Sequence, residues 1–345
     1  MIDLRSDTVT TPTKEMKQFL IEAPIGDDVY GEDPSINYLQ EKVAQIFNKE
    51  AALFVPSGTM ANLISVLTHC NRGDEILLGN KSHIFFYEAG GVSAYGGIHS
   101  HQLNNNDDGT INIDDIENNI RKTGDDHYPK TKLLCLENTH NYCYGTPIDS
   151  KYFKEVKKVI QKYDIKMHID GARIFNAAQA LGESVEELTE HADSISCCLS
   201  KGLSAPVGSL IIGKKKFIQK ARRIRKSLGG GMRQAGLLAA AGTYSLDFMI
   251  SRLEEDQKNA YELARQLDTI DNIKIDISKV KTNIIFFHLI SDEISDVQFL
   301  ADLIKNNIKI DYKGNRKFRI VTHSGFESSN IKTVTTIIKK IIKDS

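Results

Sequence analysis

The stretch Ser194–Lys216, SISCCLSKGLSAPVGSLIIGKKK, places one lysine between two apolar runs. The residues before Lys201 are small or apolar, and the turn sequence Gly-Leu-Ser-Ala-Pro follows it at once. A second apolar run, Ser209–Gly213, comes after the turn. A lysine in this position is either a solvated turn residue, which is the commoner case because lysine is rarely buried without a partner, or a reactive amine held in a pocket. The rest of the chain has to decide between these two interpretations.

Short apolar runs of this kind recur along the chain and alternate with helical patterns. They are AALFV, EILLG, GIHSHQL, TKLLCLEN, IKMHID, SISCCLS and SLIIG. Between them we predict helices at about 59–70 and 150–163, the second because its apolar residues repeat at helical spacing. Short, non-alternating strands separated by helices are typical of an α/β protein with a mostly parallel sheet covered by helices on both faces.

A smaller unit is predicted at the C-terminal end. After the glycines at 229–231 we expect one long helix at about 233–267, and then NIIFFHLI and FRIVTHSG as strands before a final amphipathic helix. We therefore predict a large domain over residues 1–245, with an N-terminal arm at 1–15, and a small α/β domain over residues 246–345.

Composition argues against several classes of protein. The chain has 345 residues, of which 41% are hydrophobic and 26% charged, and its formal net charge is −1. This balance gives no electrostatic footprint for nucleic acid or an anionic membrane, and no apolar run approaches the ~20 residues that span a bilayer. The five cysteines do not suggest a disulfide framework, and the polar start does not resemble a secretory signal. We predict a cytoplasmic enzyme without nucleic-acid or membrane partners.

Polar groups follow the predicted strands at the edge where ligands bind in open α/β sheets. They are the small-residue turn at 56–62, His83, the segment 137–141, Asp170 with Arg173, and Lys201. The turn at 56–62 opens a helix, whose free N–H groups and dipole suit a phosphate, although alone it is more typical of an ordinary strand–helix turn.

Together these groups match the requirements of pyridoxal phosphate. An aspartate can hold a pyridinium nitrogen protonated, a lysine amine can form a Schiff base with an aldehyde, and a histidine can stack on a flat ring. Asp170 and Lys201, which lie 31 positions apart and each follow a strand, are the pair on which this interpretation depends. Asp170 as a helix cap and Arg173 as a surface helix residue remain open alternatives at this point.

Several ordered motifs resemble the low-specificity branch of the L-threonine aldolases. They are LRSDTVT, GDDVYGEDP, FVPSGTMAN, LENTHN, HIDGARIFNA, CLSKGL, PVGS and GGGMRQ, which run from Ile2 to about Asp247, followed later by RIVTH. The family has the aspartate-aminotransferase-like fold of pyridoxal phosphate enzymes, known as fold type I. The resemblance therefore implies this fold, this cofactor and Lys201 as the lysine that forms the Schiff base.

The resemblance also implies roles around the cofactor. Gly58 and Thr59 would bind its phosphate, His83 would stack on its ring, and Asp170 would pair with its ring nitrogen. Arg233, in the glycine-rich turn, would reach a phosphate, that of the neighbouring subunit. The smallest active unit would then be a homodimer, or a homotetramer, with sites shared between subunits.

Further residues would face the amino-acid substrate. Arg173, which would also lie at the cofactor, and Arg319 would grip the substrate carboxylate together with Ser6. Tyr30 would lie at the mouth of the site.

The implied reaction is the retro-aldol cleavage of L-threonine, L-allo-threonine and related β-hydroxy amino acids to glycine and an aldehyde such as acetaldehyde, a step of threonine catabolism and glycine biosynthesis. His83 or the second active-site histidine, His127, alone or through a water, would take the β-hydroxyl proton, with Glu88 as a candidate partner. The alternatives are a β-eliminating lyase or an aminotransferase on the same scaffold, and a scaffold protein without activity.

Other features are predicted to be structural. The pairs His140 with Cys143 and His99 with His101 do not make a three- or four-ligand metal set, so no metal site is predicted. The basic run at 214–226 is expected to be a solvated helix face.

Overall fold

A seven-stranded sheet forms the centre of the larger part of the molecule, the large lobe. The computed structural model describes residues 1–121, 124–290 and 292–344, and the strand order is β2-β8-β7-β6-β5-β3-β4. The strands are β2 (Ala51–Val55), β3 (Glu75–Gly79), β4 (His99–Leu103), β5 (Thr131–Glu137), β6 (Lys166–Asp170), β7 (Ser194–Cys198) and β8 (Ser209–Gly213). Neighbours pair in parallel, except that β8 runs antiparallel to β2 and β7. The prediction of a mostly parallel α/β sheet is confirmed.

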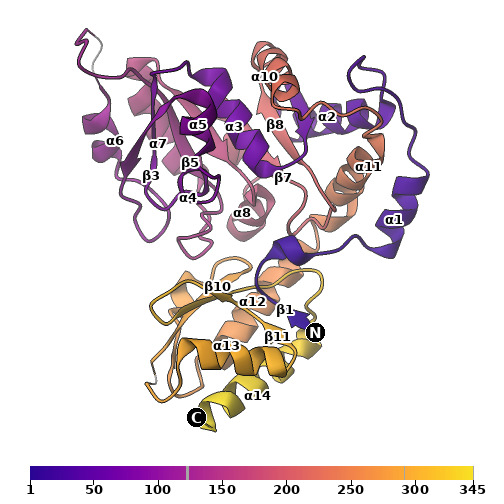
Figure 1. The fold of residues 1–345 in the computed structure, drawn as a ribbon, viewed down its shortest axis with the longest axis vertical. Helices are drawn as coiled ribbons and strands as arrows, with labels where there is room; N and C mark the ends of the chain where they lie inside the picture. The colour runs from indigo at the N-terminus through magenta and orange to yellow at the C-terminus, as the bar shows by residue number, and fades with distance from the viewer. Residues whose placement is uncertain (122–123, 291, 345) are drawn as a thin grey trace.

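Helices cover both faces of this sheet (Figure 1), and alternate strand residues pack against them. Ile76 and Leu78 of β3 lie in a core cluster on one face, and Leu77 lies in the core on the other. The first face is covered by α3 (Gly58–His69), α4 (His83–Phe86), α5 (Gly91–Gly96) and α10 (Lys215–Ser227). The second is covered by α2 (Pro34–Ile46), α6 (Ile113–Asn119), α7 (Ser150–Ile160), α8 (Ile174–Leu181), α9 (Val185–Thr189) and α11 (Gly236–Tyr244). Because both faces are covered, β3, β7 and β8 are buried at every residue.

The small lobe is built on a four-stranded antiparallel sheet with the order β12-β13-β10-β9. Its strands are β9 (Ile273–Lys274), β10 (Ile284–Leu289), β12 (Asp311–Tyr312) and β13 (Lys317–Val321), and its helices are α12 (Leu253–Leu267), α13 (Asp296–Lys305) and α14 (Ser328–Lys343). Arg319 of β13 lies opposite Phe286 of β10 in the register. This agrees with the small α/β unit predicted for the C-terminal end, and the boundary at residue 245 stays a prediction.

The N-terminal arm crosses to the small lobe before the chain enters the large one. Strand β1 (Ile2–Asp3) pairs in parallel with β11 (Ile308–Lys309), and Leu4 is fully buried in the small-lobe core. The chain then continues through η1 (Asp7–Val9) and α1 (Lys14–Ile21). This differs from the predicted assignment of the whole arm to the large domain, because the first residues bury their apolar side chains against the other lobe.

The predicted long helix at 233–267 is interrupted. Helix α11 ends at Tyr244, a π-helical turn η3 (Ser245–Met249) follows, and α12 begins only at Leu253. The buried Ser245 hydroxyl donates to the carbonyl oxygen of Leu203 over 2.8 Å, which ties this turn to the loop after Lys201. The apolar spacing continues through the interruption, so the periodicity alone did not reveal it.

Within the described part of the chain, no helix has the length and apolar character that crossing a membrane requires. The shorter elements η2 (Gln161–Tyr163) and η4 (Ile277–Lys279) complete the fold.

Candidate active site

Lys201 and Asp170 lie at the carboxyl ends of adjacent parallel strands. β6 ends at Asp170, which pairs in register with Ser196 of β7, and Lys201 follows three residues after β7 ends. The Thr10 hydroxyl donates to the carbonyl oxygen of Lys201 over 3.0 Å, so the arm between the lobes holds the turn in place. The two residues singled out in the sequence therefore share the edge of the sheet where α/β proteins bind ligands.

Asp170 is a buried carboxylate with its oxygens occupied. Oδ2 accepts from the side-chain amide of Asn62 over 2.8 Å, and Oδ1 accepts from the backbone N–H of Ala172 over 3.1 Å. Burial alone would raise the pKa of Asp170, but the charges of His83 and Lys201 hold it below its ordinary value. An ionised, fixed carboxylate of this kind can pair with a protonated ring nitrogen.

His83 begins α4 and contacts Glu88 through its ring. His83 Nδ1 lies 2.9 Å from Glu88 Oε1, and the His83 backbone N–H donates to Glu137 over 2.7 Å. Burial alone would lower the pKa of His83, but the hydrogen bond to Glu88 and the charge of Asp170 raise it. Burial also raises the pKa of Glu88. The pair is suited to accepting and releasing a proton.

His83, Glu88 and Asp170 bring their ligand atoms within 4.8 Å of one another, a distance at which three such groups could share a cation. The amide nitrogen of Asn62, however, donates to Glu88 Oε1 over 2.7 Å and to Asp170 Oδ2 over 2.8 Å. A hydrogen-bond donor that points between two carboxyl groups already satisfies them and opposes a cation there.

Arg173 is buried beside the N-terminal arm. Its Nε and Nη2 each donate to one oxygen of Asp7 over 2.7 Å, which leaves Nη1 facing Asn141 Oδ1 at 3.5 Å. Burial alone would raise the pKa of Asp7, but the Arg173 cation lowers it, so the pair stays ionised. Ser6 precedes Asp7 and accepts from the backbone N–H of Thr8 over 3.3 Å, as the cap of η1.

Arg319 reaches the same place from the small lobe. Its Nη1 donates to Asn141 Oδ1 over 2.6 Å, and its Nη2 donates to the Arg5 carbonyl oxygen over 3.0 Å and pairs with Asp311. Among the atoms that the structure describes, the buried Nε of Arg319 has no hydrogen-bond partner. Burial and the Arg173 cation lower the pKa of Arg319. Two guanidinium groups that meet at one neutral amide form a site suited to a carboxylate.

The start of α3 offers donors for a phosphate. The Ser57 side chain caps the helix by accepting from the Met60 N–H over 3.2 Å. In the described part of the chain, no group accepts from the N–H of Gly58 or Thr59. A Cβ at Gly58 would lie 2.7 Å from Cys198 Sγ, so only glycine fits between the helix start and β7. Unpaired N–H groups at a helix start bind anions.

The structure does not bring His127 to this chain's own site. His127 lies in the loop before β5, whereas the site is at the other end of that strand, after Glu137. Its side chain is 90% exposed, and its Nδ1 pairs with Asp125 over 2.7 Å. The prediction of His127 as a second histidine of the site therefore does not hold within one chain, because the length of the strand separates it from Lys201.

Tyr30 and Arg233 also lie outside the cluster. Tyr30 is 74% exposed, and the Arg233 side chain is 55% exposed and pairs with Asp27 over 3.1 Å. The Arg233 carbonyl oxygen accepts from the backbone N–H of Asp28, so both residues belong to one exposed region of the large lobe. The roles predicted for these two residues therefore stay predictions.

Two residues of the cluster, Asp7 and Asn62, had no role in the sequence analysis. Both lie inside quoted motifs, LRSDTVT and FVPSGTMAN. Asn62 follows Gly58 by one helical turn and Asp7 follows Ser6, so their places beside predicted site residues were the available signal. Their partners in space, Asp170 and Arg173, are more than 100 residues away.

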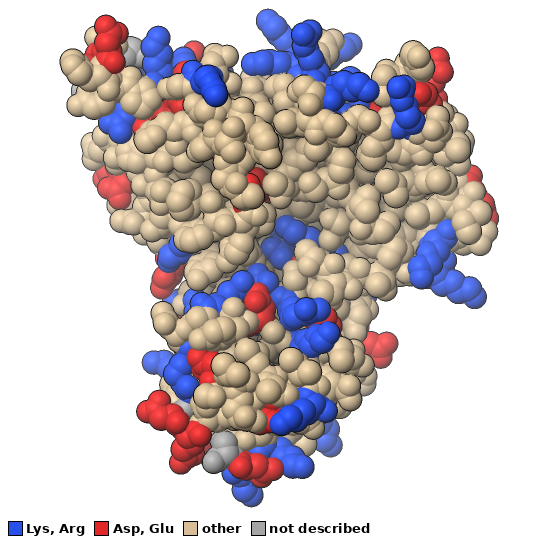
Figure 2. All heavy atoms as spheres, in the orientation of Figure 1, with Lys and Arg blue, Asp and Glu red and all other residues tan. Residues whose placement is uncertain are grey.

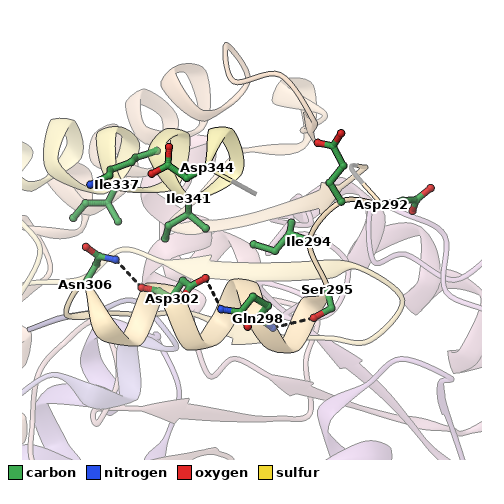
Figure 3. A pocket seen from close by; sticks show the side chains of 11 residues that line it. Asp292, Ile294, Ser295, Gln298, Asp302, Asn306, Ile337, Ile341 and Asp344 are labelled. Carbon is green, nitrogen blue, oxygen red and sulfur yellow. Dashed lines mark hydrogen bonds between the residues drawn. The ribbon is translucent and has the colours of Figure 1, made fainter.

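A hollow on the small lobe has polar groups that serve a structural role. The hollow of Figure 3 lies on the small lobe, where Gln298 donates to Asp302 over 2.7 Å and Ser295 caps α13, so its polar groups serve the helix. Figure 2 shows basic side chains gathered where the two lobes meet, with acidic ones beside them. The junction of the lobes is therefore the best candidate for an active site, and its guanidinium groups suit a substrate that carries a carboxylate.

Comparison with known families supports this interpretation. The beta-eliminating lyase family matches residues 3–290. A probable low-specificity L-threonine aldolase 2 of Arabidopsis thaliana is 46% identical over 99% of this chain and 97% of its own length. The low specificity L-threonine aldolase of Escherichia coli (strain K12) is 46% identical over 83% of this chain and 84% of its own length.

Solved structures share the fold. A threonine aldolase of Leishmania major superposes with a TM-score of 0.83 over 99% of this chain and all of its own, at 17% identity. A putative L-allo-threonine aldolase of Listeria monocytogenes EGD-E superposes with a TM-score of 0.80 over 99% of this chain and 96% of its own, at 19% identity. At these identities the comparison concerns the fold alone, and it confirms the predicted fold type.

Proposed function

Since this chain belongs to the beta-eliminating lyase family, with low-specificity L-threonine aldolases among its relatives, we propose that it cleaves L-threonine and L-allo-threonine to glycine and acetaldehyde. The reaction breaks the Cα–Cβ bond of a β-hydroxy amino acid. A base takes the β-hydroxyl proton, the hydroxyl oxygen becomes the aldehyde oxygen, and the electron pair left on Cα takes up a proton to give glycine. The chain is a lyase that uses pyridoxal phosphate.

The residues of the site fit this cofactor. The free N–H groups at Gly58 and Thr59 suit its phosphate, Asp170 suits its ring nitrogen, and Lys201 suits its aldehyde. A ring nitrogen of His83 lies within 4.8 Å of the Asp170 carboxylate, so the His83 ring could stack on the bound cofactor ring. When bound, pyridoxal phosphate delocalises the electron pair that the broken Cα–Cβ bond leaves behind.

Asp170 and Lys201 are proposed to hold the cofactor at its ring nitrogen and its aldehyde. The Lys201 amine would hold the cofactor by bonding to its aldehyde carbon. Asp170, kept ionised by its neighbours, holds the proton on the ring nitrogen.

Arg319 and Arg173 orient the substrate. Both groups contact Asn141, through Arg319 Nη1 and Arg173 Nη1, and among the described atoms Arg319 Nε has no acceptor. A carboxylate held there would fix the rotation of the substrate about Cα and so select which of the bonds to Cα is cleaved. Arg233 and Tyr30 are proposed to act in the site of a neighbouring chain.

The β-hydroxyl proton is proposed to pass to His83, directly or through a water. His83 is held by Glu88, whose carboxyl group accepts from its Nδ1 and leaves Nε2 for the substrate. His127 is the alternative, in which case it comes from another chain, because its own site is out of reach.

The meeting of Asp170, Lys201 and two guanidinium groups at the junction of the lobes is the observation that carries the proposal. The test is product analysis with L-allo-threonine and purified, cofactor-loaded protein. We expect equal amounts of glycine and acetaldehyde, and Lys201→Ala should lose this turnover while the exposed Lys216→Ala keeps it. Ammonia and a keto acid would instead indicate β-elimination or transamination on the same scaffold.

We further propose that the enzyme works as a homodimer or homotetramer in the cytoplasm, where it breaks down threonine and supplies glycine. The exposed positions of Tyr30 and Arg233 support shared sites. Cell fractionation and the mass of the protein in solution test these two points.

A further inference from the structure

A chain of buried hydrogen bonds leads away from Asp170 through Asn62. Asn62 Oδ1 lies 3.1 Å from His168 Nε2, and His168 Nδ1 lies 2.9 Å from Ser194 Oγ. Ser194 Oγ lies in turn 2.8 Å from His69 Nε2. Asn62, His168, Ser194 and Asp170 are each at most 2% exposed. This hydrogen-bond chain thus runs from Asn62 on α3 through β6 and β7 back to His69 at the end of α3.

The two carboxyl groups determine the orientation of the Asn62 amide. Its nitrogen donates both of its hydrogens, one to Glu88 and one to Asp170. Its oxygen must then face Ser196, whose hydroxyl donates to it over 2.7 Å, and His168. An amide oxygen only accepts, so His168 Nε2 must carry a hydrogen.

The protonation of the two histidines follows. Burial lowers the pKa of His168 to about 4 and the pKa of His69 to about 3, so both rings are neutral at neutral pH. With its hydrogen on Nε2, His168 accepts at Nδ1, and the Ser194 hydroxyl must donate there. Ser194 has then used its hydrogen and accepts from Nε2–H of His69. Every donor in the chain points toward Asp170.

We propose that Asn62, His168 and Ser194 are positioning residues that form a one-directional hydrogen-bond chain, beginning at His69, which keeps the Asp170 carboxylate ionised and fixed for the cofactor nitrogen. The proposal rests on the proposed function for the role of the cofactor, but the direction of the chain does not.

The surroundings of Asp170 show why such a chain is useful. A buried carboxyl group tends to take up a proton, and a protonated Asp170 could not hold a proton on the ring nitrogen. Lys201 and His83 face Asp170 from the substrate side, and Glu88 adds a like charge there. Lys201 is proposed to react with the cofactor, whereas Asn62 and His168 are not. The chain therefore supplies the part of the stabilisation that stays constant.

The far end of the chain is anchored by packing. The His69 ring stacks on Phe217 of α10 with 4.6 Å between centroids. Its neighbour Thr68 accepts from Lys220 of the same helix through its carbonyl oxygen over 2.6 Å. Helix α10 thus holds the first donor in place.

The direction is tested on the wild-type protein without cofactor by ¹⁵N NMR of labelled histidines at about pH 7. Signals are assigned with His69→Gln and His168→Gln. We expect both rings to be neutral with the hydrogen on Nε2. A hydrogen on Nδ1 of His168, or an imidazolium at either position, would overturn the proposal whether or not the protein is an aldolase.

The role is tested by titrating each variant with pyridoxal phosphate and following the absorbance. Asn62→Leu and His168→Leu should weaken cofactor binding by about tenfold or more, since each removes support from a charged acceptor. His168→Gln, which keeps an N–H near Asn62, should recover most of the affinity. Thr68→Val on α3, which keeps the backbone carbonyl that Lys220 contacts, is the control and should bind as wild type. Equal affinity in His168→Leu and His168→Gln would refute the role, even if cleavage of threonine had not been found.

Discussion

Arg319 holds a guanidinium group inside a strand, where a charged residue requires a partner. The structure gives it Asn141, the Arg5 carbonyl oxygen and Asp311, and leaves one buried nitrogen without an acceptor in the part of the chain that it describes. Arg173 lies close enough that its charge lowers the pKa of Arg319, after burial itself. The two guanidinium groups repel each other beside a neutral amide, and an anion that binds between them would offset this repulsion.

Replacing Arg319 by Ala should therefore weaken substrate binding specifically. We expect KM for L-allo-threonine to rise about 10- to 100-fold, as expected for the loss of charge-assisted hydrogen bonds, while the cofactor absorbance is unchanged. Arg316→Ala is the matched control, because Arg316 donates to the Leu289 and Ile294 carbonyl oxygens within the small lobe. Steady-state kinetics of both variants decide this, and an unchanged KM in Arg319→Ala would exclude the role.

The His83–Glu88 pair predicts a change in pH dependence. The hydrogen bond to Glu88 raises the pKa of His83, so Glu88→Gln should lower that pKa. If neutral His83 is the base, activity rises as pH passes through its pKa, and the acidic limb of kcat should move down by about half a unit to one unit. His83→Phe keeps a flat ring. We expect this variant to lose the acidic limb of the pH profile and most of the activity. An active His83→Phe enzyme with an unaltered profile would show that another group is the base.

At the scale of elements, the strands and their ends could be predicted because short apolar runs separated by helices determine a parallel sheet, whose carboxyl edge collects Asp170 and Lys201. The contacts of Asp7 could not be predicted from the sequence. They depend on the two-residue strand β1, which pairs with β11 some 300 residues away. The break between α11 and α12 also could not be predicted from the sequence, because the apolar spacing continues through it. The feature that marks the break is the hydrogen bond of a buried serine hydroxyl.

Helix α12 contains a buried carboxyl group whose pKa is raised by burial. Asp256 is buried beside Arg252, and burial raises its pKa to about 7. A carboxyl group whose pKa is raised by folding stabilises the fold when protonated and loses that contribution as pH rises through the folded-state pKa. Asparagine does not ionise, so the Asp256→Asn protein does not lose stability in this way. The melting temperature of Asp256→Asn minus that of wild type should therefore increase between pH 5 and pH 8, by about 1–3 °C.

Thermal unfolding of the two proteins at several pH values measures this difference. The control is Glu255→Gln, which changes an exposed carboxyl group that pairs with the same Arg252. A difference between Asp256→Asn and wild type that is constant with pH would contradict the assigned pKa.

At the scale of the whole molecule, the predicted site residues fall into two groups. One group meets at the junction of the lobes in a single chain, and the other, Tyr30, Arg233 and His127, lies exposed away from it. Three consecutive glycines precede Met232 and Arg233, and in this turn a Cβ at Gly230 would clash with the Met60 sulfur at the start of α3. A glycine turn of this kind allows another chain to approach closely. We therefore expect each site to be completed by a second chain.

Mixing two inactive variants tests this expectation. Lys201→Ala and Arg233→Ala are unfolded and refolded together, and each is also refolded alone as a control. If Arg233 acts in the neighbouring site, one site of a mixed dimer carries both defects and the other carries neither, so up to about a quarter of the wild-type activity should return for an equal mixture. If Arg233 acts in its own chain, every site keeps one defect and no activity returns. Mixed dimers that form, as shown by a tag on one chain, and remain inactive would contradict the shared site, while the role of Lys201 would still stand because it lies with Asp170 inside one chain.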